Sequence, residues 1–184
     1  MAKKRLFVGI FTEKEIFKGK YSKIKKEFGG ILPGRWIKPE NFHITLKFIG
    51  SVEEEKIPEI QKVLEKYTEK LQDLNIEVKG LGAFPNVKNP KILFAKVDDK
   101  DGILKKLNRE IEDKLAELGI KKETKPFTPH ITLKRIKEVN VEKFIEKMKK
   151  FENLSFGKQK KGKVNLIESI TAPKGAVYKI VKKD

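Results

Sequence analysis

The five-residue segment His-Ile-Thr-Leu-Lys occurs twice in this 184-residue sequence, at residues 43–47 and 130–134. The chain contains two histidines, and each one begins a copy of the segment. Polar and apolar residues alternate in both copies, which predicts a β-strand with one face on a core and the other face open. Because about half the chain separates the copies, the repeat indicates two similar halves related by a pseudo-two-fold axis.

The alternation also predicts where each side chain of the repeat points, because residues two apart on a strand share a face. His43 should share the open face with Thr45, and His130 should share it with Thr132. The apolar residues of both copies should enter the core: Ile44, Leu46, Ile131 and Leu133. Two such strands facing each other would bring two imidazoles and two hydroxyl groups to one place, and no other pair of segments could do so.

The rest of the chain is predicted to alternate between strands and helices, which gives an α+β fold with a loose half-to-half repeat. We expect strands at residues 5–11, 35–38, 43–49, 76–84, 92–97, 130–136 and 176–181, with residues 156–171 forming a strand or a hairpin. We expect helices at residues 51–71 and 101–118, where apolar residues recur with helical spacing, and a shorter helix at residues 141–151. We expect another at residues 12–28, because Thr12 can serve as its N-cap and Gly29-Gly30 can end it.

The net charge is +17, from 43 Lys and Arg against 26 Asp and Glu, and the pI is about 9.8. Such a charge favours a polyanionic partner such as RNA, DNA or an acidic membrane surface. The excess of Lys and Glu also resembles the composition of thermophile proteins, which explains part of the charge without any partner. The absence of Cys excludes disulfides and thiolate chemistry.

The sequence predicts neither a membrane span nor a secretory signal. No apolar run approaches the roughly 18 residues that cross a bilayer. The apolar stretch at residues 6–11 is short for a signal peptide, and no small-residue cleavage site follows it. We therefore expect a soluble cytoplasmic protein.

The surroundings of the two copies, PENFHITLKFIG at residues 39–50 and KPFTPHITLKR at residues 125–135, resemble the paired His-x-Thr motifs of the 2H phosphoesterase superfamily. They are most similar to its archaeal and bacterial RNA 2′,3′-cyclic phosphodiesterases, also called 2′-5′ RNA ligases. The opening strand, Trp36 and the proline before His130 fit as well. The resemblance implies that residues 1–184 form a single bilobal domain, in which two antiparallel sheets line a central cleft and the helices pack outside.

The resemblance also implies an activity and a set of site residues. Members open the 2′,3′-cyclic phosphate ends of RNA, tRNA halves among them, to leave a 2′-phosphate, and they can run in reverse as 2′-5′ ligases. His43 and His130 would be the catalytic pair, while Thr45, Thr132 and Arg135 would bind the phosphate. On an ideal strand Arg135 would point away from His130, so its role requires the strand to twist or end there. No cofactor is expected, and we expect a monomer.

The chemistry gives a reason for two histidines. Opening a cyclic phosphate requires water on one side of phosphorus and a departing ribose oxygen on the opposite side. One neutral imidazole can take the proton from water, and one imidazolium can protonate the leaving oxygen. The resemblance assigns the base to His130 and the acid to His43. Zinc is disfavoured because Cys is absent and no carboxylate stands at ligand spacing from either histidine.

Several alternatives remain open from the sequence. The protein could instead act on a small nucleotide, such as ADP-ribose 1″,2″-cyclic phosphate or a 2′-5′ oligonucleotide, or bind RNA ends without catalysis. Lys47 and Lys134 share the predicted open face, either as solvated strand ends or as phosphate contacts. The basic run at residues 158–163 is either a solvated hairpin tip or a contact for an RNA backbone.

Overall fold

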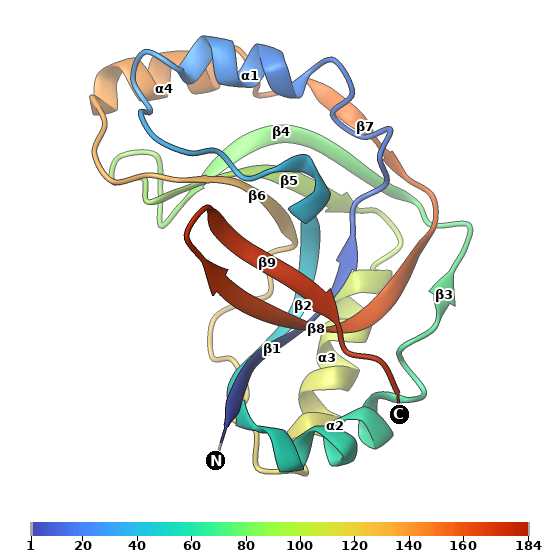
Figure 1. Ribbon diagram of the computed structural model, residues 1–184. Helices are drawn as coiled ribbons and strands as arrows, with labels where there is room; N and C mark the ends of the chain where they lie inside the picture. Colours follow the sequence, from blue (N-terminus) through green and yellow to red (C-terminus); the bar gives the residue numbers. More distant parts are fainter. Residues whose placement is uncertain (1, 184) are drawn as a thin grey trace.

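A computed structural model describes residues 2–183, which contain four α-helices and nine strands arranged in two antiparallel sheets (Figure 1). The first sheet has the order β2 (His43–Glu53), β1 (Lys3–Phe11), β8 (Gly162–Ala172) and β3 (Lys70–Leu71), and β9 (Gly175–Ile180) also pairs with β8. The second sheet has the order β6 (His130–Arg135), β5 (Ile92–Asp99), β4 (Ile76–Phe84) and β7 (Ser155–Gln159). The predicted α+β class is therefore confirmed.

The two halves share one connectivity, which confirms the predicted pseudo-two-fold arrangement. The helices are α1 (Tyr21–Phe28), α2 (Ile57–Leu64), α3 (Ile103–Ala116) and α4 (Val141–Lys149). The second half runs β4-β5-α3-β6-α4-β7, and the first runs β1-α1-β2-α2-β3, with β8 from the C-terminal part of the chain in the place of β4. Each copy of the repeat forms an edge strand, β2 or β6, and these two strands contact each other.

The halves are interlocked, because each exchanges one helix with the other. Helix α1 follows β1 of the first sheet, yet it packs against α4 over the second sheet, where the ring of Phe28 lies 5.8 Å from that of Phe144 (Figure 1). Helix α3 follows β5 of the second sheet, yet it packs against α2 and β2. Neither sheet can therefore complete its covering layer without a helix from the other half.

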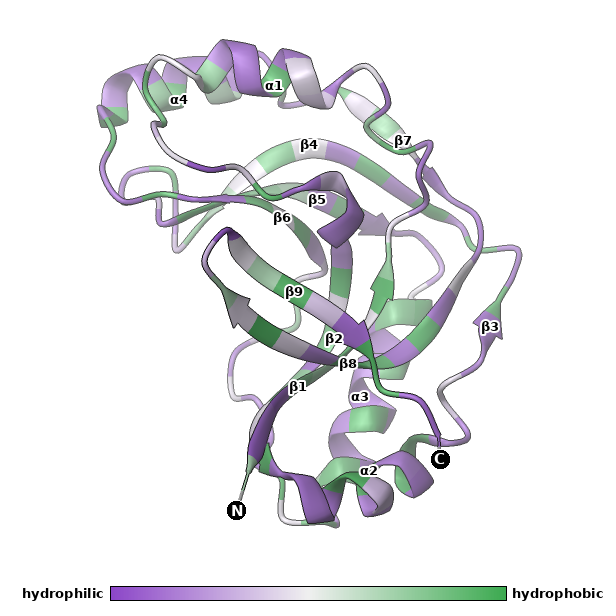
Figure 2. Ribbon diagram, in the orientation of Figure 1, coloured by the Kyte–Doolittle hydropathy of each residue, from purple (hydrophilic) through white to green (hydrophobic). Residues whose placement is uncertain are grey.

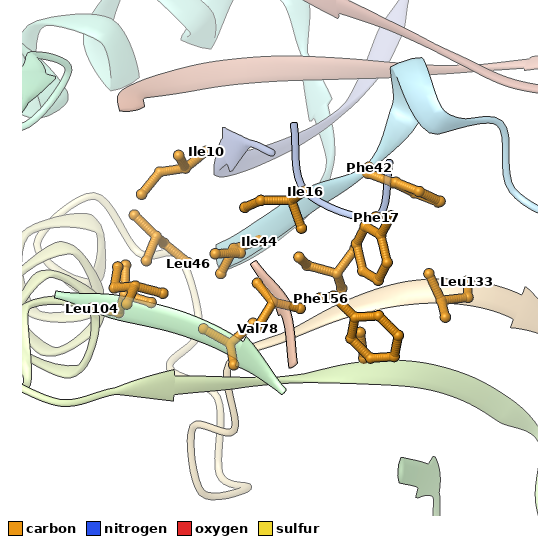
Figure 3. Close-up of a cluster of buried hydrophobic side chains, with 14 of the residues drawn as sticks. Ile10, Ile16, Phe17, Phe42, Ile44, Leu46, Val78, Leu104, Leu133 and Phe156 are labelled. Carbon is orange, nitrogen blue, oxygen red and sulfur yellow. The ribbon is translucent and has the colours of Figure 1, made fainter. Parts of the chain in front are cut away.

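One hydrophobic core joins both halves. Figure 3 shows side chains of β2, Ile44 and Leu46, in the same cluster as Val78 of β4, Leu104 of α3 and Leu133 of β6. All five are at most 1% exposed, as the alternation predicted for the apolar residues of the repeat. Burying each such side chain stabilises the fold by about 1.5–3 kcal/mol.

The helix predicted at residues 12–28 is wrong in its first half, because α1 begins only at Tyr21. Phe17 has a positive φ of 71° and Gly19 one of 74°, which a right-handed helix cannot contain. The backbone N–H of Phe17 donates instead to the carbonyl of Phe156 on β7. The apolar side chains of this segment thus reach the core from turns rather than from a helix.

The helix predicted at residues 51–71 is also shorter than expected. Strand β2 continues through Gly50, which has a φ of 93°, to Glu53, and a 3₁₀ turn over Glu54–Lys56 precedes α2. Pro58 lies in the first turn of α2, where its missing N–H costs no hydrogen bond. The predicted strand at residues 35–38 is absent, although the N–H of Ile37 donates to the carbonyl of Leu133.

The segment at residues 156–171 forms neither one strand nor a hairpin. It contains β7, which pairs with β4, and β8, which pairs with β1, so the basic run at residues 158–163 crosses from one sheet to the other. Gln159 within this run is 1% exposed, and its side-chain oxygen accepts a hydrogen bond from the N–H of Glu13 at 3.0 Å. The run is therefore anchored to the fold rather than forming a free tip.

Hydrophilic and hydrophobic residues alternate along most strands and helices (Figure 2). None of the helices within residues 2–183 is both long enough and apolar enough to cross a membrane.

Candidate functional site

The first copy of the repeat contains a β-bulge directly after its threonine. In the ladder between β1 and β2, Gly9 stands opposite Thr45 and Val8 stands opposite Lys47, so Leu46 has no opposite residue. A bulge adds one residue to a strand and shifts the alternation of side chains beyond it. Leu46 and Lys47 therefore both point into the protein.

The second copy contains the same bulge at the equivalent position. In the ladder between β5 and β6, Phe94 stands opposite Thr132 and Leu93 stands opposite Lys134, so Leu133 is the extra residue. The two copies therefore share a backbone irregularity as well as a sequence. This agreement between strands of different sheets indicates that the bulge is a specified feature of both.

The bulge explains how Arg135 reaches the face of His130. Residues directly opposite each other in an antiparallel ladder point the same way. Lys96 opposes His130, Phe94 opposes Thr132 and Ile92 opposes Arg135, and these three residues of β5 alternate along one face. The odd offset that would turn Arg135 away on an ideal strand is cancelled by the extra residue.

The bulge also places both repeat lysines in the protein interior, so their predicted position on the open face is wrong. Lys47 is 5% exposed and Lys134 is 3% exposed. Each has moved to the face of the preceding leucine because the extra residue reverses the alternation. Neither is a solvated strand end, and neither shares a face with its histidine.

His43 is held in one defined tautomer. Its Nδ1 atom lies 2.7 Å from the carbonyl oxygen of Asn41, and since a carbonyl can only accept, Nδ1 carries the proton and donates it. In the neutral ring Nε2 then keeps a free lone pair. The imidazole packs against two aromatic rings, with its centroid 4.8 Å from that of Phe7 and 5.0 Å from that of Tyr178, the latter edge-on.

His130 has an equivalent environment. Its Nδ1 lies 2.7 Å from the carbonyl oxygen of Thr128, also two residues earlier, and donates a hydrogen bond there. Its ring centroid is 4.8 Å from Phe84 and 5.1 Å from Phe94. Both imidazoles therefore present Nε2 as the atom free to exchange a proton.

Burial lowers the pKa of both imidazoles below the ordinary histidine value, because the charged form loses hydration. The hydrogen bond from Nδ1 to the backbone carbonyl raises each pKa by a smaller amount. The positive charge of protonated His130 further lowers the pKa of His43, so the two rings are close enough to interact. A positive charge on one ring thus disfavours protonation of the other. For His130, burial is the largest cause of the lowered pKa.

The two threonines occupy the positions predicted for them. Thr45 stands opposite Gly9, and Thr132 stands opposite Phe94, each on the face of its own histidine and each half-buried. At Gly9 a Cβ atom would come within 2.8 Å of the carbonyl oxygen of Ile44, so only glycine fits beside Thr45. The hydroxyl groups can therefore donate to a group bound between the histidines.

Tyr178 belongs to this site, although sequence reasoning did not identify it. It lies on β9, and its ring packs 5.3 Å from Phe7 as well as against His43. Burial raises the pKa of its hydroxyl, and the positive charges of Arg135 and Arg5 act in the opposite direction. Arg135 of the second sheet thus comes near a residue of the first. No local signal predicts this, because it depends on the pairing of β9 with β8.

The open faces supply cationic and hydroxyl donors rather than a metal-binding cluster. Within residues 2–183, no three side chains of His, Asp or Glu are grouped so that they could hold a metal ion. The donors that accompany the imidazoles are Thr45, Thr132, Arg135 and Lys96, which is exposed opposite His130. Such a set suits an anionic group that exchanges protons with two imidazoles.

Comparison with known proteins identifies sequence relatives over nearly the whole chain. The profile of the family described as AKAP7 2′5′ RNA ligase-like domain matches residues 10–183. A protein of Aquifex aeolicus named RNA 2′,3′-cyclic phosphodiesterase is 36% identical over 179 residues, which are 97% of this chain and 95% of the relative. A protein of Archaeoglobus fulgidus with the same name is 36% identical over 175 residues, which are 95% of this chain and 96% of the relative.

Solved structures share the fold. TT0787 of Thermus thermophilus superimposes with a TM-score of 0.73 at 24% identity, covering 97% of this chain and 95% of that protein. LigT of E. coli, in a crystal structure with 3′-AMP, superimposes with a TM-score of 0.69 at 21% identity, covering 98% of this chain and 97% of that protein. The bilobal arrangement of two antiparallel sheets is therefore common to these proteins.

Proposed function

Because the chain belongs to the AKAP7 2′5′ RNA ligase-like domain family, whose paired motif is that of the 2H phosphoesterases, we propose that it hydrolyses 2′,3′-cyclic phosphate ends of RNA to 2′-phosphomonoesters. The observation that carries this proposal is the matched pair of imidazoles. His43 and His130 lie on adjacent edge strands, each donates Nδ1–H to the carbonyl two residues earlier, and each keeps Nε2 free.

In the proposed reaction His130 is the general base and His43 is the general acid. Nε2 of His130 takes a proton from water as the water oxygen bonds to phosphorus. The bond from phosphorus to the ribose 3′-oxygen breaks, and Nε2–H of His43 gives that oxygen its proton. Each transfer typically contributes about 10²–10⁴-fold to the rate. The two histidine environments are nearly equivalent, so the division of roles rests on the family's mechanism.

Thr45, Thr132 and Arg135 would stabilise the charge on the non-bridging phosphate oxygens. Their place on the open faces supports this role, and so does the influence of Arg135 on Tyr178 across the two sheets. These donors would perform the charge stabilisation that a bound metal performs in other phosphodiesterases. We therefore propose a metal-independent reaction without a cofactor.

The same residues would support 2′-5′ ligation, in which a 5′-hydroxyl replaces water as the nucleophile. If the 5′-hydroxyl of a second RNA takes the place of water, loses its proton to His130 and bonds to phosphorus, the 3′-oxygen leaves as before and a 2′-5′ linkage results. Ligation therefore needs no additional catalytic group. It would be weak wherever water outcompetes the second RNA.

RNA is proposed as the substrate because of the charge of +17, which attracts a polyanion more strongly than a small nucleotide. All proposed site residues come from one chain, so we propose that the protein acts as a monomer, in the cytoplasm, with residues 1–184 forming one bilobal domain. The continuous core and the exchanged helices support the single domain.

The test compares three substrates in the presence of EDTA: RNA ending in a 2′,3′-cyclic phosphate, a 2′,3′-cyclic mononucleotide and a 2′-5′ dinucleotide. We expect the cyclic-ended RNA to be the best substrate and ³¹P NMR to identify the product as a 2′-phosphate. Preferential cleavage of the 2′-5′ dinucleotide would favour a small-nucleotide enzyme. Tight binding of cyclic-ended RNA without turnover would indicate a non-catalytic end-binding protein.

A further inference from the structure

Lys47, at the end of the first repeat, contacts the segment that leads to the second. Its ammonium group forms a buried ion pair with Glu112 of α3 and donates a hydrogen bond to the carbonyl oxygen of Lys121 at 2.8 Å. Lys121 belongs to the loop of residues 117–129 between α3 and β6, which leads to His130. The first repeat is thus bonded to the approach to the second histidine.

Lys134, at the end of the second repeat, makes the reciprocal contact. Its ammonium group donates to the carbonyl oxygen of Arg35 at 2.8 Å and lies 5.6 Å from the centroid of the Trp36 ring. Arg35 belongs to the segment of residues 29–42 between α1 and β2, which leads to His43. The second repeat is thus bonded to the approach to the first histidine.

The geometry points to a crosswise role: we propose that Lys47 and Lys134 are positioning residues, each fixing the segment that orients the histidine of the other repeat. Each of these segments contains the carbonyl that receives the Nδ1–H of its histidine, at Thr128 in one case and Asn41 in the other. A displaced segment would move that carbonyl and turn the ring.

The bulges provide a second set of crosswise bonds. The carbonyl of Leu46, which the bulge releases from the ladder, accepts a hydrogen bond from Nδ2 of Asn108 on α3 at 2.7 Å. The carbonyl of Leu133 accepts one from the backbone N–H of Ile37 at 2.9 Å. Each bulge therefore bonds, through its carbonyl and through the following lysine, to chain that precedes the other repeat.

Further hydrogen bonds extend both attachments. Glu112 uses its second carboxylate oxygen to accept the N–H of Glu123 at 3.1 Å, so the loop before β6 is held at two points. In the other segment the carbonyl of Ile37 accepts the hydroxyl of Tyr21 at 2.5 Å, and the guanidinium of Arg35 donates to the carbonyl of Pro173 at 2.9 Å. Lys47 and Lys134 are thus the buried members of two small hydrogen-bond networks.

Burial of these ammonium groups requires a reason. Removing a charge from water is costly, and an apolar residue at the same position often stabilises a fold as well or better. For Lys134 burial lowers the pKa, which reflects that cost. Directed hydrogen bonds to single carbonyls give the positional precision that an apolar contact lacks.

The part of the proposal that concerns turnover rests on the proposed function, whereas the part that concerns ring orientation does not.

The test uses NMR of the imidazole nitrogens, which is direct because the protein has two histidines. Lys47→Met should shift the Nδ1–H resonance of His130 and leave that of His43 unchanged, and Lys134→Met should do the reverse. Lys105→Met, an exposed change of equal charge on α3, should alter neither. A change confined to the histidine of the mutated repeat, or no change at either histidine, would overturn the proposal.

Kinetics supply a second readout. We expect kcat for cyclic-ended RNA to fall roughly 10- to 100-fold in each Met variant with KM nearly unchanged, because misplaced catalytic groups impair the transition state more than substrate binding. Lys47→Gln and Lys134→Gln keep a donor without the charge, should recover part of kcat, and allow the same comparison if the Met variants do not fold. Unchanged kcat in folded variants would contradict the proposal.

The two proposals fail in different ways. A crosswise NMR pattern in a protein that hydrolyses no cyclic phosphate would overturn the proposed function and leave the lysine attachments standing. Normal hydrolysis with each lysine affecting only its own histidine would overturn the lysine attachments alone.

Discussion

Phe48 and Arg135 occupy equivalent positions in the two sheets, since each follows its histidine by five residues and lies beyond the same bulge. Both therefore lie on the open faces. At this position the two halves differ in the side chain that they present. Phe48 is 49% exposed, with the guanidinium of Arg5 5.0 Å from its ring centroid. The second half presents a cation at this position and the first half presents an aromatic surface.

This asymmetry makes Arg135 the clearest phosphate ligand to test. Arg135→Ala should lower kcat/KM for cyclic-ended RNA by about 10²–10³-fold, because it removes the charged donor that we propose binds the phosphate. Arg109→Ala, an exposed change of the same kind on α3, serves as the matched control and should have little effect. Equal, small effects of both changes would mean that Arg135 acts only through net charge.

The bulge is also where sequence reasoning reached its limit. The alternation of His43, Ile44 and Thr45 correctly predicted the face of each side chain up to the threonine. After Thr45 the sequence Leu-Lys continues the alternation of apolar and polar residues. In the structure, however, Leu46 is an extra residue of β2 with no opposite residue on β1. A bulge depends on the partner strand and on capping groups far away in sequence, such as Asn108, so the local pattern cannot reveal it.

The helices show a related limit. Thr12 as an N-cap and Gly29-Gly30 as a stop favoured one long helix, but the left-handed backbone at Phe17 breaks the helical conformation between them. Tyr178 was missed for a different reason, because its place beside His43 depends on pairing between β8 and β9. The placement of the repeated histidines and threonines was therefore predictable, and contacts made only through tertiary structure were not.

The pH dependence of kcat/KM follows from the lowered imidazole pKa values. The base must be neutral, which requires a pH above its pKa, and the acid must be charged, which requires a pH below its pKa. Since burial lowers both pKa values below about 6.5, the bell-shaped profile of the free enzyme should have its maximum on the acid side of that value. The measurement is kcat/KM between about pH 4 and 9 at constant ionic strength. An alkaline limb centred above about pH 7 would contradict the assigned shifts.

The exchanged helices predict one cooperative unfolding transition. Urea unfolding followed by the fluorescence of Trp36 and by far-UV circular dichroism should give coincident curves, because α1 and α3 each complete the layer of the other half. Two separate transitions would mean that the halves are independent domains. In the expected case of one transition, Leu46→Ala should lower the free energy of unfolding by about 2–5 kcal/mol. Both unfolding curves should shift together.

Salt dependence distinguishes an RNA footprint from a general excess of lysine. Binding of a cyclic-ended oligonucleotide should weaken steeply with salt, with a slope of about −0.7 per phosphate contacted. A cyclic mononucleotide offers one phosphate, so its slope should be much smaller. Binding constants measured between about 50 and 300 mM salt would show the difference. Equal slopes for the two ligands would favour a small nucleotide, rather than RNA, as the substrate.

The most direct test of paired imidazole catalysis is single-turnover hydrolysis of cyclic-ended RNA in EDTA by His43→Ala, His130→Ala and the double variant. Each single change should lower the rate constant by at least about 10²-fold, and the double variant should lose little more, because the two proton transfers belong to one concerted step. Binding of the RNA should persist and the fold should remain intact, since neither ring belongs to the hydrophobic core. If either single variant kept more than about a tenth of the wild-type rate constant, or if EDTA abolished the wild-type activity and a metal restored it, the account would be contradicted.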